Sequence, residues 1–259
     1  MQGRVYSWGT RVLYVGPGLV AGLHAHHAVQ VFIPLSAPIR LRASRRAPWR
    51  TYAGAVAGAD VAHESDTPLA LIASIWMDAD TREARALAPA AAGRGIVPIA
   101  PERLRAVVPD LRACWDGAWD GRRAADLLDA LMDRLAPTTP PAAPVDARIA
   151  RAQEILTAAP LRRVAIGDVA AAVSLSPSRL AHLLRPHLGL PVRRYLLWMR
   201  LRDAIQEIAR GASTTAAAHA AGFADASHRD RTFRRMLGFT PSAARAVSQF
   251  VQDMPAASV

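Results

Sequence analysis

Short runs of apolar or alternating residues occupy roughly the first eighty positions of the chain, with glycines and prolines between them. The runs begin at residues 11, 29, 38, 54 and 69 and read "RVLYVG", "VQVFIPL", "PIRLRA", "GAVAGADVAH" and "LALIASIWM". Period-two alternation punctuated by turn-forming residues is typical of strands. The pattern therefore predicts a β domain over residues 1–95.

The periodicity changes after Pro101, where apolar residues take helical spacing. Leu127, Leu128, Leu131 and Leu135 fall on one face of such a helix. We expect a helical pair over residues 96–135. Its apolar face either covers the sheet or forms a dimer interface, and the sequence leaves both interpretations open.

A proline-rich segment, "APTTPPAAP" at 136–144, follows the helical pair. It carries four prolines in nine residues, which excludes a helix interior or a central strand. We place a domain boundary at this semi-rigid linker. Residues 145–259 then form a second domain, which is helical by periodicity.

The second domain contains one pattern twice, at 166–188 and at 214–238. Each copy has a short helix, a tight turn and a longer basic helix that ends at Leu-Gly. Ala170 precedes Ser174 by four residues, and Ala218 precedes Gly222 by four. A small alanine lets two helices cross closely, and the serine or glycine stands where a positive φ is needed. This is the helix-turn-helix arrangement, whose second helix enters the major groove.

The segment between the two copies, residues 191–211, predicts a long connecting helix. Pro191 suits its N1 position and Gly211 its C-terminal end. Twenty helical residues span about 30 Å, and one turn of B-DNA is about 34 Å. A rigid connector of this length would suit two recognition helices in successive major grooves.

The string "GFADASHRDRTFRRMLGFTPSAAR", with "YLLWMRLRDA" before it, resembles the DNA-binding region of AraC/XylS transcriptional regulators. The resemblance covers about residues 145–248. It implies an α+β multidomain protein with a cupin-like β-barrel or sandwich sensor domain, packed helices, and an all-α double helix-turn-helix domain. It also implies promoter DNA as partner, a small-molecule effector, a homodimer, and RNA polymerase if the protein activates.

The resemblance also assigns positions that would contact DNA. In the first unit the helix is Ser176–His187, with Ser176 as its cap. The base-reading positions fall on Ser178, Ala181 and His182, and the phosphate contacts on Arg179 and Arg185. In the second unit the helix is Asp225–Leu237. The reading positions there are Ala226, Ser227, Asp230 and Arg231, and the phosphate contacts are Arg234 and Arg235.

Two residues of the second unit depart from the family pattern. Arg229 stands where a large apolar residue is usual, and Ala217 stands where an isoleucine is usual. Arg229 either extends outward and adds a phosphate contact, or leaves this unit less stable than its relatives.

The charge distribution agrees with a polyanionic partner for the second domain. The whole chain carries a net charge of +11. Residues 1–144 hold 16 Arg against 13 acidic residues, whereas residues 145–259 hold 16 Arg against 8. An excess of basic residues in one domain indicates nucleic acid as a partner.

A histidine cluster in the β domain suggests separate chemistry. His24, His26 and His27 stand in "GLHAHHAVQ" with Gln30 after them, and His63 lies further along. If this segment is a strand, residues 24 and 26 project to the same side of it. This spacing resembles the cupin metal motif, except that Gln30 replaces the usual glutamate. Three interpretations stay open: a divalent-metal site, a metal-free effector pocket, and structural histidines.

Taken together, these patterns predict a sequence-specific DNA-binding regulator and not an enzyme. The alternatives are a metal-dependent cupin enzyme with a DNA-binding tail and a nonspecific basic DNA-binding protein. The longest apolar run, at 69–77, is too short to cross a bilayer, and no signal-peptide pattern opens the chain. A single cysteine, Cys114, fits a reducing compartment, so we expect a cytoplasmic protein without a membrane partner.

Overall fold

The chain divides into two compact units. The computed structural model describes residues 2–68, 70–91, 95–117, 119–136, 146–158, 165–223, 225–243 and 248–251. The sheet unit comprises Met1–Pro140 and Asp230–Val259, and the helical unit comprises Pro141–Arg229. Residues 137–144 of the expected linker lie outside the described residues.

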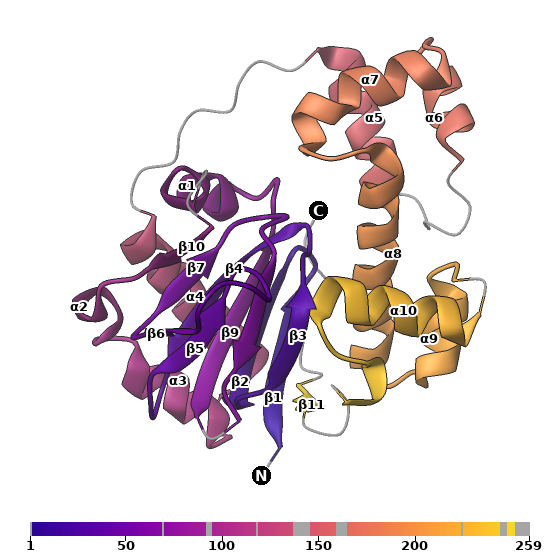
Figure 1. Cartoon of the computed structure of the whole chain (residues 1–259). Helices are drawn as coiled ribbons and strands as arrows, with labels where there is room; N and C mark the ends of the chain where they lie inside the picture. The colour runs from indigo at the N-terminus through magenta and orange to yellow at the C-terminus, as the bar shows by residue number, and fades with distance from the viewer. Residues whose placement is uncertain are drawn as a thin grey trace. The chain divides into compact units, whose positions relative to one another are not determined.

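Sheet A is the larger sheet of the sheet unit (Figure 1). Its described strands follow the order β10-β7-β4-β9-β2-β1-β11, and all pairs are antiparallel except β1 with β11. The strands are β1 (Gly3–Trp8), β2 (Arg11–Pro17), β4 (Ala28–Pro34), β7 (Ala55–Ala57), β9 (Leu71–Asp78), β10 (Ile96–Pro98) and β11 (Ser248–Phe250). Because β4 and β9 are buried on both faces, their sequences read as nearly continuous apolar runs.

Sheet B completes a β-sandwich, one of the two forms that the family resemblance implies for this domain. Its described strands follow the order β3-β8-β5-β6, and the pairs are antiparallel. They are β3 (Val20–His24), β5 (Ile39–Arg42), β6 (Arg50–Tyr52) and β8 (His63–Asp66). Ile39 and Leu41 of sheet B are fully buried in one apolar cluster with Phe32 and Ile72 of sheet A. This cluster is the core between the two sheets.

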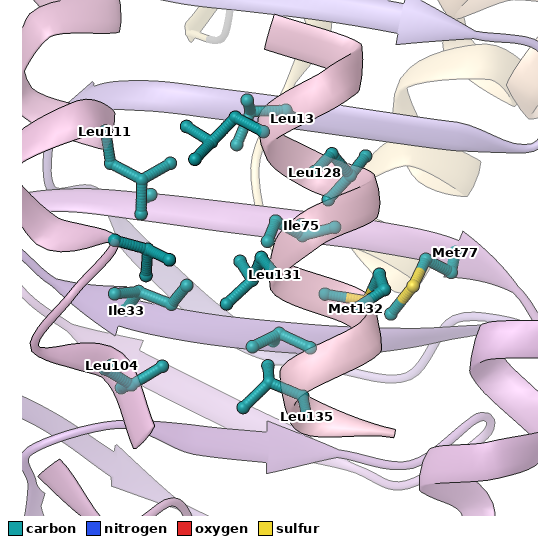
Figure 2. Close-up of a cluster of buried hydrophobic side chains, with 14 of the residues drawn as sticks. Leu13, Ile33, Ile75, Met77, Leu104, Leu111, Leu128, Leu131, Met132 and Leu135 are labelled. Carbon is teal, nitrogen blue, oxygen red and sulfur yellow. The ribbon is translucent and has the colours of Figure 1, made fainter. Parts of the chain in front are cut away.

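Helices cover the opposite face of sheet A, and the leucines of the predicted helical stripe pack against that face. The helices are α1 (Arg82–Ala91), α2 (Pro101–Leu104), α3 (Val108–Trp115) and α4 (Gly121–Leu135). Figure 2 shows Leu128, Leu131 and Leu135 of α4 directed toward Ile33 and Ile75 of the sheet, all in one buried cluster. The segment expected as a helical pair, 96–135, instead begins with strand β10 of sheet A and then contains three helices, because Pro109 lies in the first turn of a new one. These helices cover the sheet.

Hydrogen bonds fasten the helical layer to β1. The hydroxyl of Tyr6 lies 3.3 Å from the carbonyl oxygens of both Cys114 and Trp119, which share its single donor hydrogen. Tyr6 and Cys114 are fully buried, and burial raises the pKa of each to about 12. A buried neutral thiol with a raised pKa is a poor nucleophile, which agrees with a structural role for Cys114.

The helical unit contains the elements expected for a double helix-turn-helix region. They are α5 (Ala147–Ala158), α6 (Ile166–Ala172), α7 (Pro177–Leu188), α8 (Val192–Ala209) and α9 (Thr214–Ala220). The last helix, α10 (Ala226–Leu237), crosses the boundary between the units at residue 229. None of the described helices is both long and apolar enough to cross a membrane.

The connecting helix differs from its prediction at its first residue. Pro191 has φ −60° and ψ 136°, so it is the extended N-cap of α8 and not its first helical residue. Gly211 follows the end of α8 with φ 93°, as expected for a terminating glycine. Residues with large buried side chains run along the helix and include Val192, Tyr195, Trp198, Met199 and Leu201.

Candidate nucleic-acid interface and histidine cluster

The first helix-turn-helix unit forms through a tight turn between α6 and α7. The N–H of Leu175 donates to the carbonyl of Ala170 over 2.9 Å, and Ser174 takes a positive φ of 55°. Ser176 caps α7, its hydroxyl accepting from the N–H of Arg179 over 3.3 Å. Pro177 follows at the first helical position, where a missing N–H has no cost.

The second unit repeats this turn forty-eight residues later. The N–H of Phe223 donates to the carbonyl of Ala218 over 3.0 Å, and Gly222 has φ 78°. Asp225 caps α10, because its carboxylate accepts from the N–H of His228 over 2.6 Å. The same hydrogen bond and the same positive φ thus occur in both copies, and they explain the shared Ala-x-x-x-Ser/Gly spacing.

Burial separates an inner and an outer face on α7. Leu180, Leu184 and Leu188 are buried. The positions assigned to DNA lie on the other side: Ala181 is half-buried, and the exposed ones are Ser178, Arg179, His182 and Arg185. The face assigned to DNA is therefore accessible and weakly basic.

The same division occurs on α10. Thr232, Phe233, Met236 and Leu237 are buried. Asp230 is half-buried, and the exposed assigned positions are Ser227, Arg231, Arg234 and Arg235. The side chain of Ala226 lies outside the described residues. This helix therefore presents three exposed arginines.

Arg229 does not extend into solvent, contrary to one of the two expectations for it. Only 6% of its surface is exposed, and its Nη1 donates to the carbonyl of Thr214 over 2.7 Å. The side chain thus connects the first turn of α10 to the start of α9. Its guanidinium replaces apolar packing with a charge-assisted hydrogen bond, and it is not positioned as a phosphate contact.

Four of the five residues singled out in the β domain come together between the sheets. His24 ends β3, His26 lies in the turn after it, His63 begins β8, and Gln30 lies on β4. One ring nitrogen from each histidine lies within 4.8 Å of the others. The His-x-His spacing suggested that His24 and His26 lie on one strand. They do not, because β3 ends at His24.

His27 is separate from this group. Its Nδ1 lies 2.8 Å from Oδ2 of Asp60, a residue that the sequence patterns did not single out. Asp60 takes a positive φ of 59° in the loop before β8, and its N–H donates to the carbonyl of His26 over 2.8 Å. An aspartate in a "GAD" turn is common, so nothing in the sequence marked this residue.

Comparison with known proteins gives a family match in the second domain and a similar fold over most of the chain. Residues 169–246 match the family model described as a helix-turn-helix domain. No curated protein matches the chain. The solved structures include ToxT from Vibrio cholerae O395, with 11% identity over 98% of each chain and a TM-score of 0.55.

Two further ToxT structures, from Vibrio cholerae strain SCE256, are also similar. An apo form carrying a substitution covers 93% of this chain and 99% of its own, with 11% identity and a TM-score of 0.61. A form described as bound to an unsaturated fatty acid covers 95% and 97%, with 10% identity and a TM-score of 0.55. At such identities the likeness shows a shared fold.

Proposed function

We propose that this chain is a DNA-binding transcriptional regulator of the AraC type and that it reads a specific promoter sequence with two recognition helices. The helices α7 and α10 enter successive major grooves, and the sandwich senses a small molecule or mediates dimerisation. The observation that carries the proposal is the repeated unit: each second helix buries its apolar side and exposes the side assigned to DNA.

Helix α10 supplies the stronger direct reading of bases. Arg231 is exposed, and a guanidinium can donate two hydrogen bonds to O6 and N7 of one guanine. Asp230 stands beside it, able to accept from a cytosine amino group or to orient the arginine. Arg234 and Arg235 neutralise phosphates, which adds affinity without sequence information.

Helix α7 supplies weaker direct reading. His182 and Ser178 are exposed and can form hydrogen bonds to base edges, whereas Ala181 offers only an apolar contact, for example to a thymine methyl. Arg179 and Arg185 meet phosphates. We therefore expect α10 to fix more base pairs of the site than α7 does.

The length of α8 supports simultaneous reading of two grooves. Its 18 residues correspond to about 27 Å of helix, close to one turn of B-DNA at about 34 Å. A nonspecific basic protein needs no such connector. Two unlike recognition helices also favour a defined, asymmetric site over a uniform affinity for all duplexes.

The sandwich is the part that senses a signal. ToxT, which shares this fold, has a structure described as bound to an unsaturated fatty acid. We propose that an effector in the sheet unit of this chain changes the affinity for promoter DNA. Such coupling requires the effector to bind two states of the protein with different affinities.

Footprinting on a selected site tests the two-groove reading. We expect two protected segments centred about one helical turn, about 10 base pairs, apart. The double variant Arg179→Ala/Arg185→Ala should weaken one segment, and Arg231→Ala/Arg234→Ala the other. A single continuous footprint weakened equally by both pairs would contradict the proposal.

A further inference from the structure

The histidine cluster, defined as His24, His26 and His63, occupies the space between the two sheets. All three side chains are buried, with exposures of 6%, 1% and 0%. The ring centroids lie 4.2 Å apart for His24 and His63, 5.1 Å for His26 and His63, and 5.5 Å for His24 and His26. Three polar rings at such distances in an apolar interior require partners for their nitrogens.

The backbone holds each ring in the same way. The Nδ1 atoms of His24, His26 and His63 lie 2.7, 3.0 and 2.9 Å from the carbonyl oxygens of residues 22, 28 and 61. A carbonyl oxygen only accepts, so each Nδ1 carries the proton and donates it. In a neutral imidazole the other nitrogen, Nε2, then bears a lone pair.

The rings are held neutral by their surroundings. Burial lowers the pKa of His24 to about 3, and the proximity of His26 adds to the effect. Burial likewise lowers the pKa of His26, and it lowers that of His63 well below the usual value. Neutral imidazoles with Nδ1 fixed on a backbone carbonyl are the form in which histidine ligates metals.

The side-chain amide oxygen of Gln30 lies beside the Nε2 atoms of two of the three histidines. This Oε1 lies 2.9 Å from Nε2 of His26 and 3.0 Å from Nε2 of His63. In this orientation an amide oxygen meets two nitrogens that bear lone pairs, an arrangement that a cation between them would stabilise. In the metal-free alternative, the amide is turned so that its NH₂ group donates to both rings.

We propose that His24, His26 and His63 bind one divalent transition-metal ion through Nε2, with Oε1 of Gln30 as a fourth ligand. Three imidazoles suit zinc, cobalt, nickel or copper, whereas calcium and magnesium prefer sites made of oxygen. In tetrahedral zinc sites neighbouring ligand atoms lie about 3.3 Å apart. One ring nitrogen from each histidine lies within 4.8 Å of the others, so rotation of the side chains is needed to bring the three Nε2 atoms to this spacing.

The charge of the site sets its expected affinity. Four neutral ligands leave the double positive charge of the ion uncompensated in a buried place, which is costly. The carboxylate of Asp60 lessens this cost, because the N–H of Asp60 donates to the carbonyl of His26 and so places a negative charge beside the cluster. Binding should therefore be weaker than in a site that includes a carboxylate.

Titration of the chelator-treated full chain with Co²⁺ tests this site. We expect visible d–d bands typical of four-coordinate cobalt, saturating at one ion per chain and displaced by Zn²⁺. His24→Ala or His63→Ala should weaken binding about a hundredfold or more. A chain that retains no stoichiometric ion and shows no such bands would overturn the proposal.

A matched control separates this site from exposed histidines. The double variant His182→Ala/His187→Ala removes two exposed imidazoles and should leave the bands and the stoichiometry unchanged. If that variant abolished cobalt binding while His63→Ala retained it, binding would be adventitious and the proposal wrong. Melting temperatures, measured without metal, identify any variant that fails to fold.

Gln30 gives a second test that does not rely on loss of binding. Gln30→Glu should tighten binding about tenfold or more, since a carboxylate offsets the charge of the ion. Gln30→Glu binding no more tightly than the wild type would contradict the role of Gln30 as a ligand. It would favour the hydrogen-bonded, metal-free arrangement.

Discussion

Nε2 of His63 lies 3.0 Å from Oε1 of Gln30, although β8 and β4 belong to different sheets. The two residues are 33 positions apart in the chain, and the phenyl ring of Phe32 packs edge-on against the same imidazole. The polar cluster is thus built across the core of the sandwich. The geometry of the cluster therefore depends on the packing of the two sheets against each other.

Arg231 and Arg234 should have different effects on DNA binding. Arg231→Ala should relax the preference at one base pair, by about 1–3 kcal/mol of discrimination. Arg234→Ala should weaken all duplexes alike and reduce the slope of log K against log salt by about one. Competition binding at several salt concentrations measures both effects. An unchanged preferred sequence after Arg231→Ala would contradict the register assigned to α10.

The positive φ values in the two turns predict opposite responses to substitution. Ser174 has φ 55°, a conformation that costs a non-glycine residue about 1–2 kcal/mol, so Ser174→Gly should raise the free energy of unfolding by up to about 1 kcal/mol. Gly222 has φ 78°, and Gly222→Ala should lower it by about 1–2 kcal/mol. Chemical denaturation of both variants provides the measurement, and equal signs would refute this explanation of the turn.

Arg229 should contribute to stability and not to DNA affinity. Its Nη1 donates to the carbonyl of Thr214, so Arg229→Ala removes a hydrogen bond from a buried charged group and should cost about 1–3 kcal/mol. The salt dependence of DNA binding by the folded fraction should not change. Arg235→Ala, at an exposed position on the same helix, is the matched control. It should leave the free energy of unfolding unchanged and should reduce the salt dependence of DNA binding.

Alkaline pH should destabilise the sheet unit. Burial raises the pKa of Tyr6, Tyr14 and Cys114 to about 12, from 10 for the tyrosines and 9 for the cysteine. Between pH 9 and 12 the unfolded chain therefore loses protons that the folded chain retains, so the free energy of unfolding falls as pH rises. The thiol begins to contribute at about pH 8 and the tyrosines at about pH 9, so below about pH 8 these groups should have no effect.

Denaturation monitored across this pH range, together with alkylation of Cys114, checks the prediction. The thiol should react slowly at pH 8 and rapidly once the protein unfolds. Fast alkylation of the native protein would show that the thiol is not held in the buried, neutral form.

The helix-turn-helix region could be predicted closely because its signals are local. Ser176 caps α7 where expected, and the turns at Ser174 and Gly222 take the positive φ that the repeat indicated. Caps, turn residues and helical periodicity act within a few positions of the chain. They survive whatever tertiary packing surrounds them.

The histidine cluster was predicted by composition but not by geometry. The alternation of His24 and His26 suggested one strand, whereas the turn at residues 25–27 brings His26 to the cluster from outside β3. The separation of His27, which faces Asp60, also depends on the loop before β8. Pairing of distant strands fixes these directions, and no local pattern encodes it.

The position of Arg229 also depends on tertiary structure that local sequence patterns do not encode. Its sequence context indicated either an outward phosphate contact or a weakened core. The guanidinium is buried and donates a hydrogen bond to the carbonyl of Thr214, the first residue of α9, fifteen residues earlier. A carbonyl partner for a buried side chain carries no residue-type signal, so the sequence could not reveal it.

Selection of binding sites from a random duplex pool at near-physiological salt tests the central claim most directly. We predict two short conserved blocks about one helical turn apart, with more fixed base pairs in the block read by α10. Recovery of no motif, with affinity that falls steeply and equally for every duplex as salt rises, would contradict sequence-specific reading by this chain.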